Sequence, residues 1–265
     1  MTNILAPGTV ERHLRARRDT GRGLLMPYVT GGVTPGWTRY LHAFAEAGAD
    51  AIEVGLPFSD PTLDGVTIQQ ASETALARGA STRRILADLA EAGEPHVPLV
   101  ASTYYNLVLH DGPAAFCAAL RRAGVSGLIV PDLPVHEADE LTDVAAAAGV
   151  DLALLAAPST PQPRLEEISR RSRGFVYAVS LMGTTGERAA LPASAADLAA
   201  RLRSSTDLPV LLGFGISTPD QVREARRHCD GVVVGAAVMR RVLDGAGPDD
   251  LRAFLATLRR ALDQE

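Results

Sequence analysis

The chain has 265 residues and a formal net charge of −5, with acidic and basic residues interspersed and no long basic segment of the kind that favours nucleic-acid binding. All 26 of its Lys and Arg positions are arginines, which excludes chemistry that needs a lysine, such as a Schiff-base aldolase, covalently held pyridoxal phosphate or a P-loop. The hydrophobic content of 46% is ample for one large core.

The start of the sequence contains no apolar run of the length found in a signal peptide, and no stretch of 18 apolar residues occurs. Cys117 and Cys229 lie far apart and have no metal-binding spacing. We therefore expect a soluble, cytoplasmic protein whose cysteines are structural, with no metal site.

Short apolar segments recur along the chain, each bounded by Gly, Pro or Asp, and their length and Val, Ile and Leu content are typical of parallel strands covered by helices. They lie at 24–29, 51–55, 98–103, 127–132, 151–156, 175–180, 209–215 and 231–236. Amphipathic segments alternate with them, several of which end in Gly, a common helix C-cap residue. These predict helices at 37–48, 82–93, 113–124, 138–149, 164–174 and 219–229.

A strand followed by a helix, repeated eight times, predicts a (β/α)8 barrel, an α/β fold. We expect residues 1–265 to form it as a single domain. An extra helix at 9–18 would close the barrel floor, and a helix at about 248–263 would complete the outer ring. A doubly wound open sheet is the alternative, although no GxGxxG follows the first strand.

The segment AIEVGLPFSDPTLDGVTIQ, at 51–69, is the most informative in the chain. Alternation along the second strand points Ile52 and Val54 toward the helices and Glu53 into the barrel. Burial there would raise the pKa of Glu53, so that it could donate and accept a proton near pH 7. A structural Glu paired with an Arg or a backbone group fits the position equally well. Asp60 is typical of a turn cap, whereas Asp64 lies in a long loop that could cover the barrel mouth.

Glycine-rich turns follow the last three strands, at 183–188, 213–218 and 235–242. Glycines let backbone N–H groups approach an anion closely, and a helix amino terminus after the eighth strand would favour negative charge. Such turns converge at one side of a barrel, where a phosphate site is common. They therefore predict a phosphate-binding site. His110 and His136 could rim the pocket, but the six histidines form no metal-binding pattern and are interpreted as structural.

The run E-V-G-L-P-F-S-D-P-T-L-D-G-V-T-I-Q closely resembles the signature of the tryptophan synthase α subunit family, and the resemblance covers essentially the whole chain. It implies a carbon–carbon lyase of tryptophan biosynthesis, which cleaves indole-3-glycerol phosphate to indole and glyceraldehyde 3-phosphate without a cofactor and works with a β subunit. Glu53 and Asp64 match the catalytic pair of that family. Other matches imply substrate binding by Tyr28, Tyr104, Ile129, Tyr177, Thr185 and Phe214, phosphate binding by Gly186, Gly215, Gly235 and Ala236, and a partner interface at Asp60 and Asp132.

The sequence departs from the family pattern near the proposed lid and phosphate site. Ala236 stands where a Ser hydroxyl usually contacts phosphate, Val66 replaces a common Pro, Thr184 replaces a common Val, and 30–36 read TGGVTPG where an Asp-Pro turn is usual. These changes keep two related hypotheses open: a stand-alone indole-3-glycerol phosphate lyase of secondary metabolism, and a catalytically weak subunit that activates a β partner. A different phosphosugar barrel, such as a sugar-phosphate isomerase, is the remaining alternative.

Overall fold

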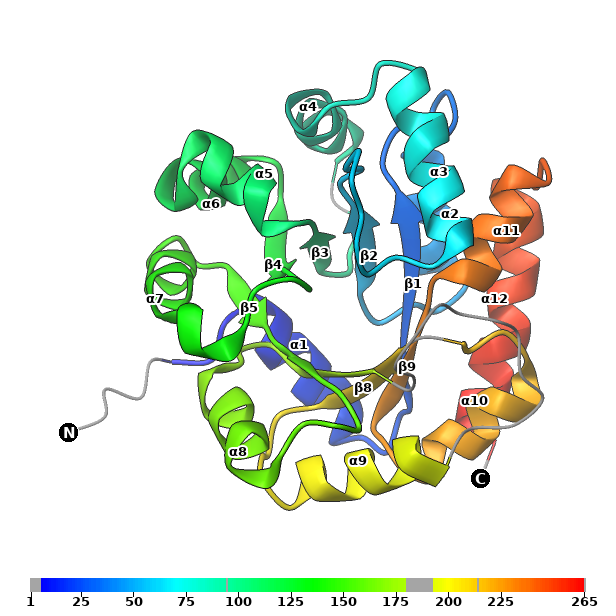
Figure 1. The fold of residues 1–265 in the computed structure, drawn as a ribbon. Helices are drawn as coiled ribbons and strands as arrows, with labels where there is room; N and C mark the ends of the chain where they lie inside the picture. Colours follow the sequence, from blue (N-terminus) through cyan, green and yellow to red (C-terminus); the bar gives the residue numbers. More distant parts are fainter. Residues whose placement is uncertain (1–5, 94, 180–192, 214, 265) are drawn as a thin grey trace.

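The computed structural model describes residues 6–93, 95–179, 193–213 and 215–264 of the chain. Within these ranges, parallel strands form one sheet (Figure 1). Every predicted apolar segment contains or overlaps a strand, and the segment 151–156 contains two. The strands are β1 Leu24–Thr30, β2 Ile52–Gly55, β3 Leu99–Ser102, β4 Val125–Ile129, β5 Asp151–Ala153, β6 Leu155–Ala156, β7 Val176–Val179, β8 Val210–Gly213 and β9 Gly231–Val234.

The sheet closes because its two ends are halves of one segment. The strand order is β5-β4-β3-β2-β1-β9-β8-β7-β6, and only Leu154 separates β5 from β6. The Leu154 amide donates a hydrogen bond to Ser172 Oγ at 3.2 Å, so its N–H is not used in a strand ladder. The predicted barrel is therefore confirmed, and the open doubly wound sheet is wrong.

Helices form a ring outside the strands (Figure 1). Each helix predicted above is present, with its ends shifted by three residues or fewer. Gly48 and Gly124 follow two of these helices with φ of +90° and +78°, a left-handed conformation that glycine adopts without strain. The helices are α1 Thr9–Arg18, α2 Arg39–Glu46, α3 Val66–Ala77, α4 Thr82–Ala92, α5 Tyr105–Asp111, α6 Pro113–Arg122, α7 Asp139–Ala147, α8 Gln162–Arg171, α9 Ala193–Arg203, α10 Pro219–Arg226, α11 Ala236–Leu243 and α12 Pro248–Asp263, with a short 3₁₀ helix at Val135–Glu137.

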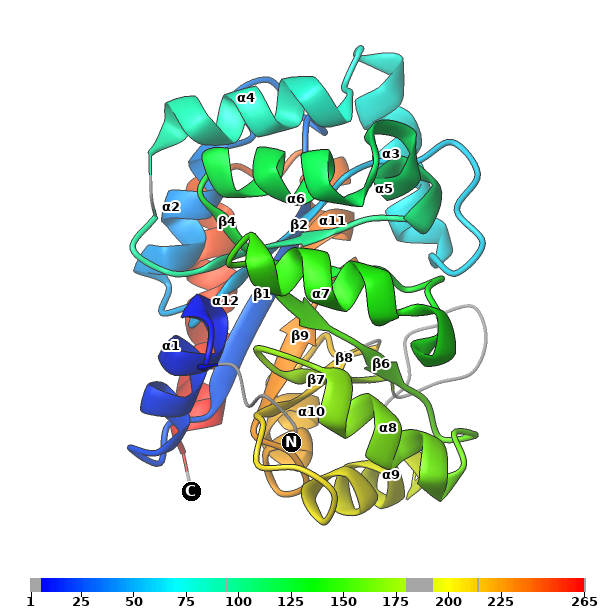
Figure 2. The same cartoon turned by 90° about the vertical axis from the view of Figure 1, so that its left-hand side faces the viewer.

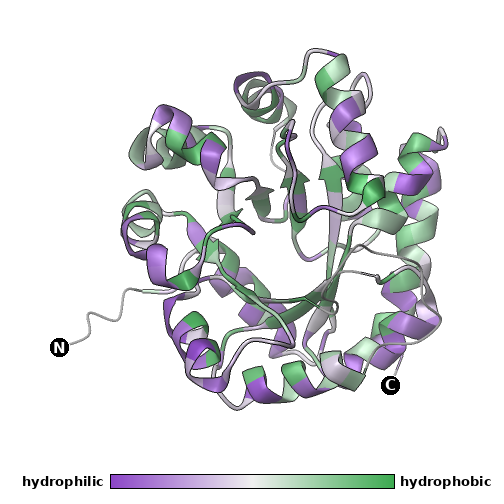
Figure 3. Ribbon diagram, in the orientation of Figure 1, coloured by the Kyte–Doolittle hydropathy of each residue, from purple (hydrophilic) through white to green (hydrophobic). Residues whose placement is uncertain are grey.

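The strand side chains divide into two apolar layers, and Figure 3 shows apolar strands inside helices whose outer faces are polar. Ile52 and Val54 of β2 belong to the layer between strands and helices. Ala51 belongs to the smaller cluster inside the barrel. Because side chains alternate along a strand, Glu53 points inward with Ala51, as predicted.

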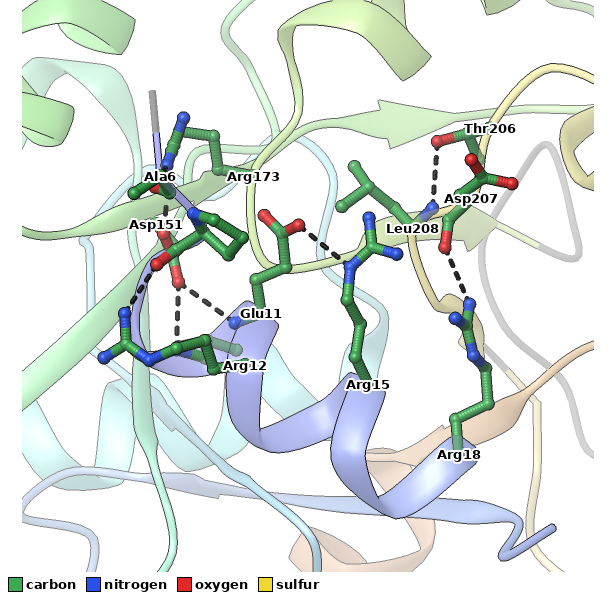
Figure 4. Close-up of polar contacts among 12 residues, drawn as sticks. Ala6, Glu11, Arg12, Arg15, Arg18, Asp151, Arg173, Thr206, Asp207 and Leu208 are labelled. Atoms are coloured by element: carbon green, nitrogen blue, oxygen red, sulfur yellow. Dashed lines mark hydrogen bonds and ion pairs between the residues drawn. The ribbon is translucent and has the colours of Figure 1, made fainter. Parts of the chain in front are cut away.

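Helix α1 closes the amino-terminal end of the barrel (Figures 2 and 4). Its Val10 and Leu14 are buried in the interior cluster. Asp151, the first residue of β5, accepts hydrogen bonds from the Val10 and Glu11 amides at 2.9 and 3.1 Å. A Cβ at Gly8 would lie only 1.7 Å from Asp151 Oδ1, so glycine is needed for the carboxylate to reach the helix. With this end covered, a substrate would enter from the opposite end.

A second buried acid holds the same end of the barrel. Asp50 is 1% exposed. It accepts hydrogen bonds from the Leu25 amide at 2.9 Å and from the Arg22 and Arg259 side chains at 2.8 and 3.0 Å. These contacts join the start of β1 to α12, which explains why acids at this end are structural. No helix within the described ranges is both long enough and apolar enough to span a bilayer.

We predict that Asp151→Ala lowers the free energy of unfolding by about 1–3 kcal/mol, because two amides at the start of α1 lose their acceptor. Urea denaturation measures the change. Asp19→Ala is the control, since Asp19 is exposed and pairs with the adjacent Arg18. Equal stabilities of the two variants would show that the α1 cap does not stabilise the barrel.

Candidate active site

A cavity lies at the open end of the barrel, where the carboxyl ends of the strands meet. Thr185, Gly186 and Phe214 of the predicted site, and the whole turn at 183–188, lie outside the described residues. The other predicted catalytic, substrate-binding and phosphate-binding residues all line this cavity: Glu53, Asp64, Tyr28, Tyr104, Ile129, Tyr177, Gly215, Gly235 and Ala236. Acidic, aromatic and glycine residues from distant parts of the chain therefore meet in one place.

Glu53 lies in the barrel wall, and one of its carboxyl oxygens has no hydrogen-bond partner among the described residues. Its side chain is 5% exposed, and its register partners are Tyr28 on β1 and Val100 on β3. Its Oε2 atom is buried and has no hydrogen-bond partner among the described residues. Leaving a buried polar atom without a partner costs about 1–3 kcal/mol. Such an atom in a cavity wall is available to accept a hydrogen bond from a ligand or to donate one to it.

The surroundings of Glu53 bring its pKa to neutrality. Burial raises the pKa from its usual 4.5 to about 7, because desolvation disfavours the ionised form. A hydrogen bond with the Ser102 side chain lowers the pKa, and the negative charge of Asp64 raises it. Among the described residues no arginine contributes to this pKa or pairs with Glu53, so the alternative of a structural Glu–Arg pair is not found there. Both protonation states of Glu53 are populated at pH 7.

Asp64 is fixed in the loop after β2 by contacts on both sides. The Leu63 amide donates to Tyr104 Oη at 3.0 Å, and Gln69 Nε2 donates to the Asp64 carbonyl oxygen at 2.8 Å. Burial raises the pKa of the Asp64 carboxyl from 3.8 to about 6, while a hydrogen bond with the Tyr104 side chain lowers it. Asp64 is therefore mainly ionised at pH 7.

Two tyrosines flank Glu53, and glycines on neighbouring strands make room for them. A Cβ at Gly55 would lie 2.0 Å from Tyr28 Oη, and one at Gly213 would lie 2.4 Å from Tyr177. Burial is the main cause that raises the pKa of both phenols well above 10, and the nearby carboxylates raise it further. Both rings therefore remain neutral, and they cover Glu53 without supplying a charge that would compete for its proton.

Backbone groups at the cavity edge suit an anion. Gly235 is the N-cap of α11, and the first hydrogen bonds of this helix to the Gly235 carbonyl come from Val238 and Met239. The preceding amides, of Ala236 and Ala237, have no intrahelical acceptor because of their position in the first turn. Gly215 has φ of +90°, and no atom of the described residues lies within 4 Å of the place where its Cβ would be. These two turns therefore present open backbone to the cavity.

The two acids predicted for the partner interface do not line the cavity. Asp60 is exposed and accepts a hydrogen bond from Ser59 Oγ at 2.5 Å, as expected of a turn. Asp132 is also exposed and accepts from the Tyr105 amide at 2.8 Å, at the start of α5. His110 and His136 are exposed near acidic neighbours. Among the described residues, no group of three or more His, Cys, Asp or Glu is arranged to hold a metal ion.

Sequence reasoning missed three polar residues of this site. Ser102 hydrogen-bonds Glu53, Gln69 holds the Asp64 backbone, and Thr103 lines the cavity with its hydroxyl buried and unpartnered among the described residues. Alternation along β3 could have identified Ser102, because it falls on the same face as the inward Val100. The contact of Gln69 depends on the folded loop and gives no comparable signal.

Comparison with known proteins agrees with this geometry. The family model for the tryptophan synthase alpha chain matches residues 14–260. The chain belongs to the tryptophan synthase alpha chain family. The family's protein from Picosynechococcus is 39% identical over 261 residues, covering 96% of this chain and 99% of that protein. That from Gluconacetobacter diazotrophicus is 43% identical over 260 residues, covering 94% of each.

Solved structures of tryptophan synthases share the fold. A chain of the Mycobacterium tuberculosis enzyme has a TM-score of 0.90 and 34% identity, covering 98% of this chain and 100% of that one. A chain of the Pyrococcus furiosus α2β2 complex has a TM-score of 0.82 and 38% identity, covering 91% of this chain and 98% of that one. The predicted family, barrel and enzyme class are confirmed: the chain is a lyase of tryptophan synthesis that cleaves indole-3-glycerol phosphate. The sugar-phosphate isomerase alternative is wrong.

The raised pKa of Glu53 predicts a pH-dependent gain in stability for Glu53→Gln. Between pH 4.5 and about 7 the folded state binds more protons at Glu53 than the unfolded state, so this residue lowers the free energy of unfolding as the pH rises. We expect the variant to be more stable than the wild type by about 3 kcal/mol at pH 8, and the difference to shrink toward pH 5.

Urea denaturation at both pH values measures this difference, with Glu91→Gln on the surface of α4 as the control. A stability difference that did not change with pH would mean that the folded and unfolded states titrate alike at Glu53.

Proposed function

We propose that this chain carries out the retro-aldol cleavage of indole-3-glycerol phosphate with Glu53 as the group that moves the protons. The observation that carries the proposal is a carboxyl in the wall of the cavity with a pKa of about 7 and a buried oxygen that has no partner among the described residues. The same cavity contains Asp64 and open glycine turns. The residues that it brings together suit the three parts of the substrate: the indole ring, the reacting carbon chain and the phosphate.

Cleavage requires two proton movements. Indole C3 gains a proton, which gives an indolenine-like cation. The adjacent side-chain hydroxyl then loses its proton and becomes the aldehyde carbonyl, while the electrons of the broken carbon–carbon bond return to the ring as the C2–C3 double bond. A carboxyl with a pKa near 7 can give the first proton and accept the second, and is regenerated at the end. Glu53 has both protonation states available at neutral pH.

The remaining groups orient the substrate and stabilise charge. Asp64 accepts a hydrogen bond from the indole N–H and stabilises the developing cation. The hydrogen bond of Asp64 with the Tyr104 side chain and its largely ionised state support this role. Ile129, with Phe214, holds the indole ring, and Tyr28, Tyr104, Tyr177 and Thr185 complete the substrate pocket. Holding the substrate at both ends lowers the entropic cost of reaching the reactive geometry.

The phosphate binds at the amino terminus of α11 and at the neighbouring glycine turns. The amides of Ala236 and Ala237 and the positive end of the helix dipole favour an anion there, and Gly186, Gly215 and Gly235 allow close approach of the backbone. Ala236 cannot supply the hydroxyl that is usual in the family. This helix therefore holds the phosphate through backbone groups.

We further propose that residues 1–265 form a single barrel domain, that the protein is cytoplasmic, and that a β subunit docks near Asp60 and Asp132. One continuous sheet supports the first point, and the phosphorylated substrate, which does not cross membranes unaided, supports the second. The α2β2 complex of Pyrococcus furiosus supports the third. Both acids are exposed at the loops that surround the mouth.

Indole release with and without a β subunit distinguishes this proposal from its alternatives. Acceleration by the β subunit is expected of a tryptophan synthase α chain. Strong activity that the partner leaves unchanged would instead identify a stand-alone lyase. Activation of the β subunit without indole release would identify a catalytically weak subunit, which the arrangement of Glu53 and Asp64 argues against.

We predict that Glu53→Gln folds but loses at least about 100-fold in kcat, because the amide can neither donate nor accept the proton. Steady-state release of indole from indole-3-glycerol phosphate measures the loss. Glu91→Gln, on the surface of α4, should retain wild-type kcat. Near wild-type indole release by Glu53→Gln would remove Glu53 from the mechanism.

We predict that Ala236→Ser binds phosphate at least about 10-fold more tightly, because a hydroxyl hydrogen bond to a charged group is worth about 1.5–3 kcal/mol. The inhibition constant of inorganic phosphate against indole release measures this. Ala114→Ser, exposed on α6, is the control. An unchanged inhibition constant for Ala236→Ser would place the phosphate away from the first turn of α11.

A further inference from the structure

Helices α3 and α11 meet beside the cavity, and each begins at a part of the site (Figure 1). Helix α3 starts two residues after Asp64, and α11 starts at Ala236, where the phosphate is proposed to bind. Ile68 of α3 lines the cavity, and its Cδ1 would lie 3.9 Å from a Cβ built at Gly235. The elements that hold the two ends of the substrate are therefore in direct contact.

Arg240 joins the two helices through polar contacts. Its Nη2 atom donates to Thr67 Oγ1 at 3.1 Å and to Gln70 Oε1 at 3.0 Å. Thr67 and Gln70 are three residues apart, so they lie on one face of α3. One guanidinium group on α11 thereby holds the first and second turns of α3.

The first turn of α3 is in turn bonded to the segment that carries Asp64. Gln69 Nε2 donates to the Asp64 carbonyl oxygen at 2.8 Å. The Ile68 and Gln69 amides both donate to the Gly65 carbonyl oxygen at 3.0 Å. A shift of α3 relative to α11 would therefore move Asp64.

The other side of helix α11 is hydrogen-bonded to strand β1 of the barrel wall. The Thr30 amide, at the end of β1, donates a hydrogen bond to Met239 Sδ at 3.1 Å. Met239 is fully buried. Because α11 is attached to the barrel wall, the contacts of Arg240 fix α3 to the barrel.

We propose that Arg240 is a positioning residue that fixes α3 against α11 and so sets the position of Asp64 relative to the phosphate end of the substrate. The inference rests on the proposed roles of Asp64 and of the α11 amino terminus. Since Arg240 does not line the cavity, and its Nη2 contacts end on neutral side chains of α3, Arg240 acts through α3 and not as a phosphate ligand. A displacement of about 1 Å at a reacting group can cost about 100-fold in rate, so loss of this link affects turnover.

The test compares Arg240→Met, which keeps a long apolar side chain and loses the donors, with the wild type. We expect kcat for indole release to fall about 10-fold, within the range that misplacement of a catalytic group produces, and the inhibition constant of inorganic phosphate to change less than about twofold. Arg252→Met is the matched control, because Arg252 lies in an exposed pair with Glu46 on α2. It should keep wild-type kcat. Arg240→Lys, with a single donor group, should recover part of the loss.

A second route removes the acceptors instead of the donor. Thr67→Val combined with Gln70→Met should lower kcat as much as Arg240→Met, and adding Arg240→Met to that pair should cause no further loss, because contacting residues are not additive. If Arg240→Met fails to fold, the double variant Thr67→Val with Gln70→Met still tests the role of the contacts between α11 and α3.

Two results would overturn the inference: wild-type kcat in Arg240→Met, or additive losses in the combined variant. Wild-type kcat together with weaker inhibition by phosphate would assign Arg240 to the phosphate itself. Failure of the wild-type protein to release any indole would overturn the proposed function, and this inference with it, whereas an active wild type with an unaffected Arg240→Met would overturn this inference alone.

Discussion

A carboxyl group kept out of water inside an apolar barrel is the constraint on which the site depends. Glu53 points inward because side chains alternate along β2, and the residues before and after it face the helices. The two tyrosine rings lie against it because Gly55 and Gly213 leave room for them. The cost of removing a charge from water is what brings the pKa of Glu53 to about 7. Proton transfer in both directions then needs no metal, lysine or histidine.

The two ends of the barrel use acids for different purposes. Asp50 and Asp151, at the amino end, are surrounded by backbone amides and arginines that satisfy their oxygens. Glu53, near the carboxyl end, has an oxygen with no partner among the described residues. The first arrangement holds strands and helices together, whereas the second leaves bonding capacity for a ligand. The number of partners, and not the residue type, separates the structural acids from the proposed catalytic acid.

The barrel fold and the inward direction of Glu53 could be predicted from the sequence because both depend on local periodicity. Period-two alternation gave the inward direction of Glu53, and apolar segments followed by helices gave the barrel. The split of the fifth strand at Leu154 could not be predicted, because it depends on Ser172, 18 residues away. Contacts over longer separations were also missed. Arg240 reaches Thr67 across 173 residues of sequence, and only the closed ring of strands brings α11 next to α3.

The assignment of Asp64 combined both kinds of information. Its spacing from Glu53 matched the family signature, but its position depends on Tyr104 from the loop after β3 and on Gln69 from α3. The departures at Val66 and Ala236 occur where α3 and α11 begin. They fall on the elements proposed to position the substrate, and neither residue contributes to the pKa of Glu53.

The protonation of Glu53 can be observed directly by carbon NMR of protein labelled at the glutamate carboxyl carbons. Comparison with Glu53→Gln assigns the signal, and a titration from pH 4 to 9 follows it. The account predicts one glutamate with a midpoint near pH 7. A midpoint near 4.5 would show that Glu53 is hydrated or paired in solution, and would contradict its role as the proton carrier.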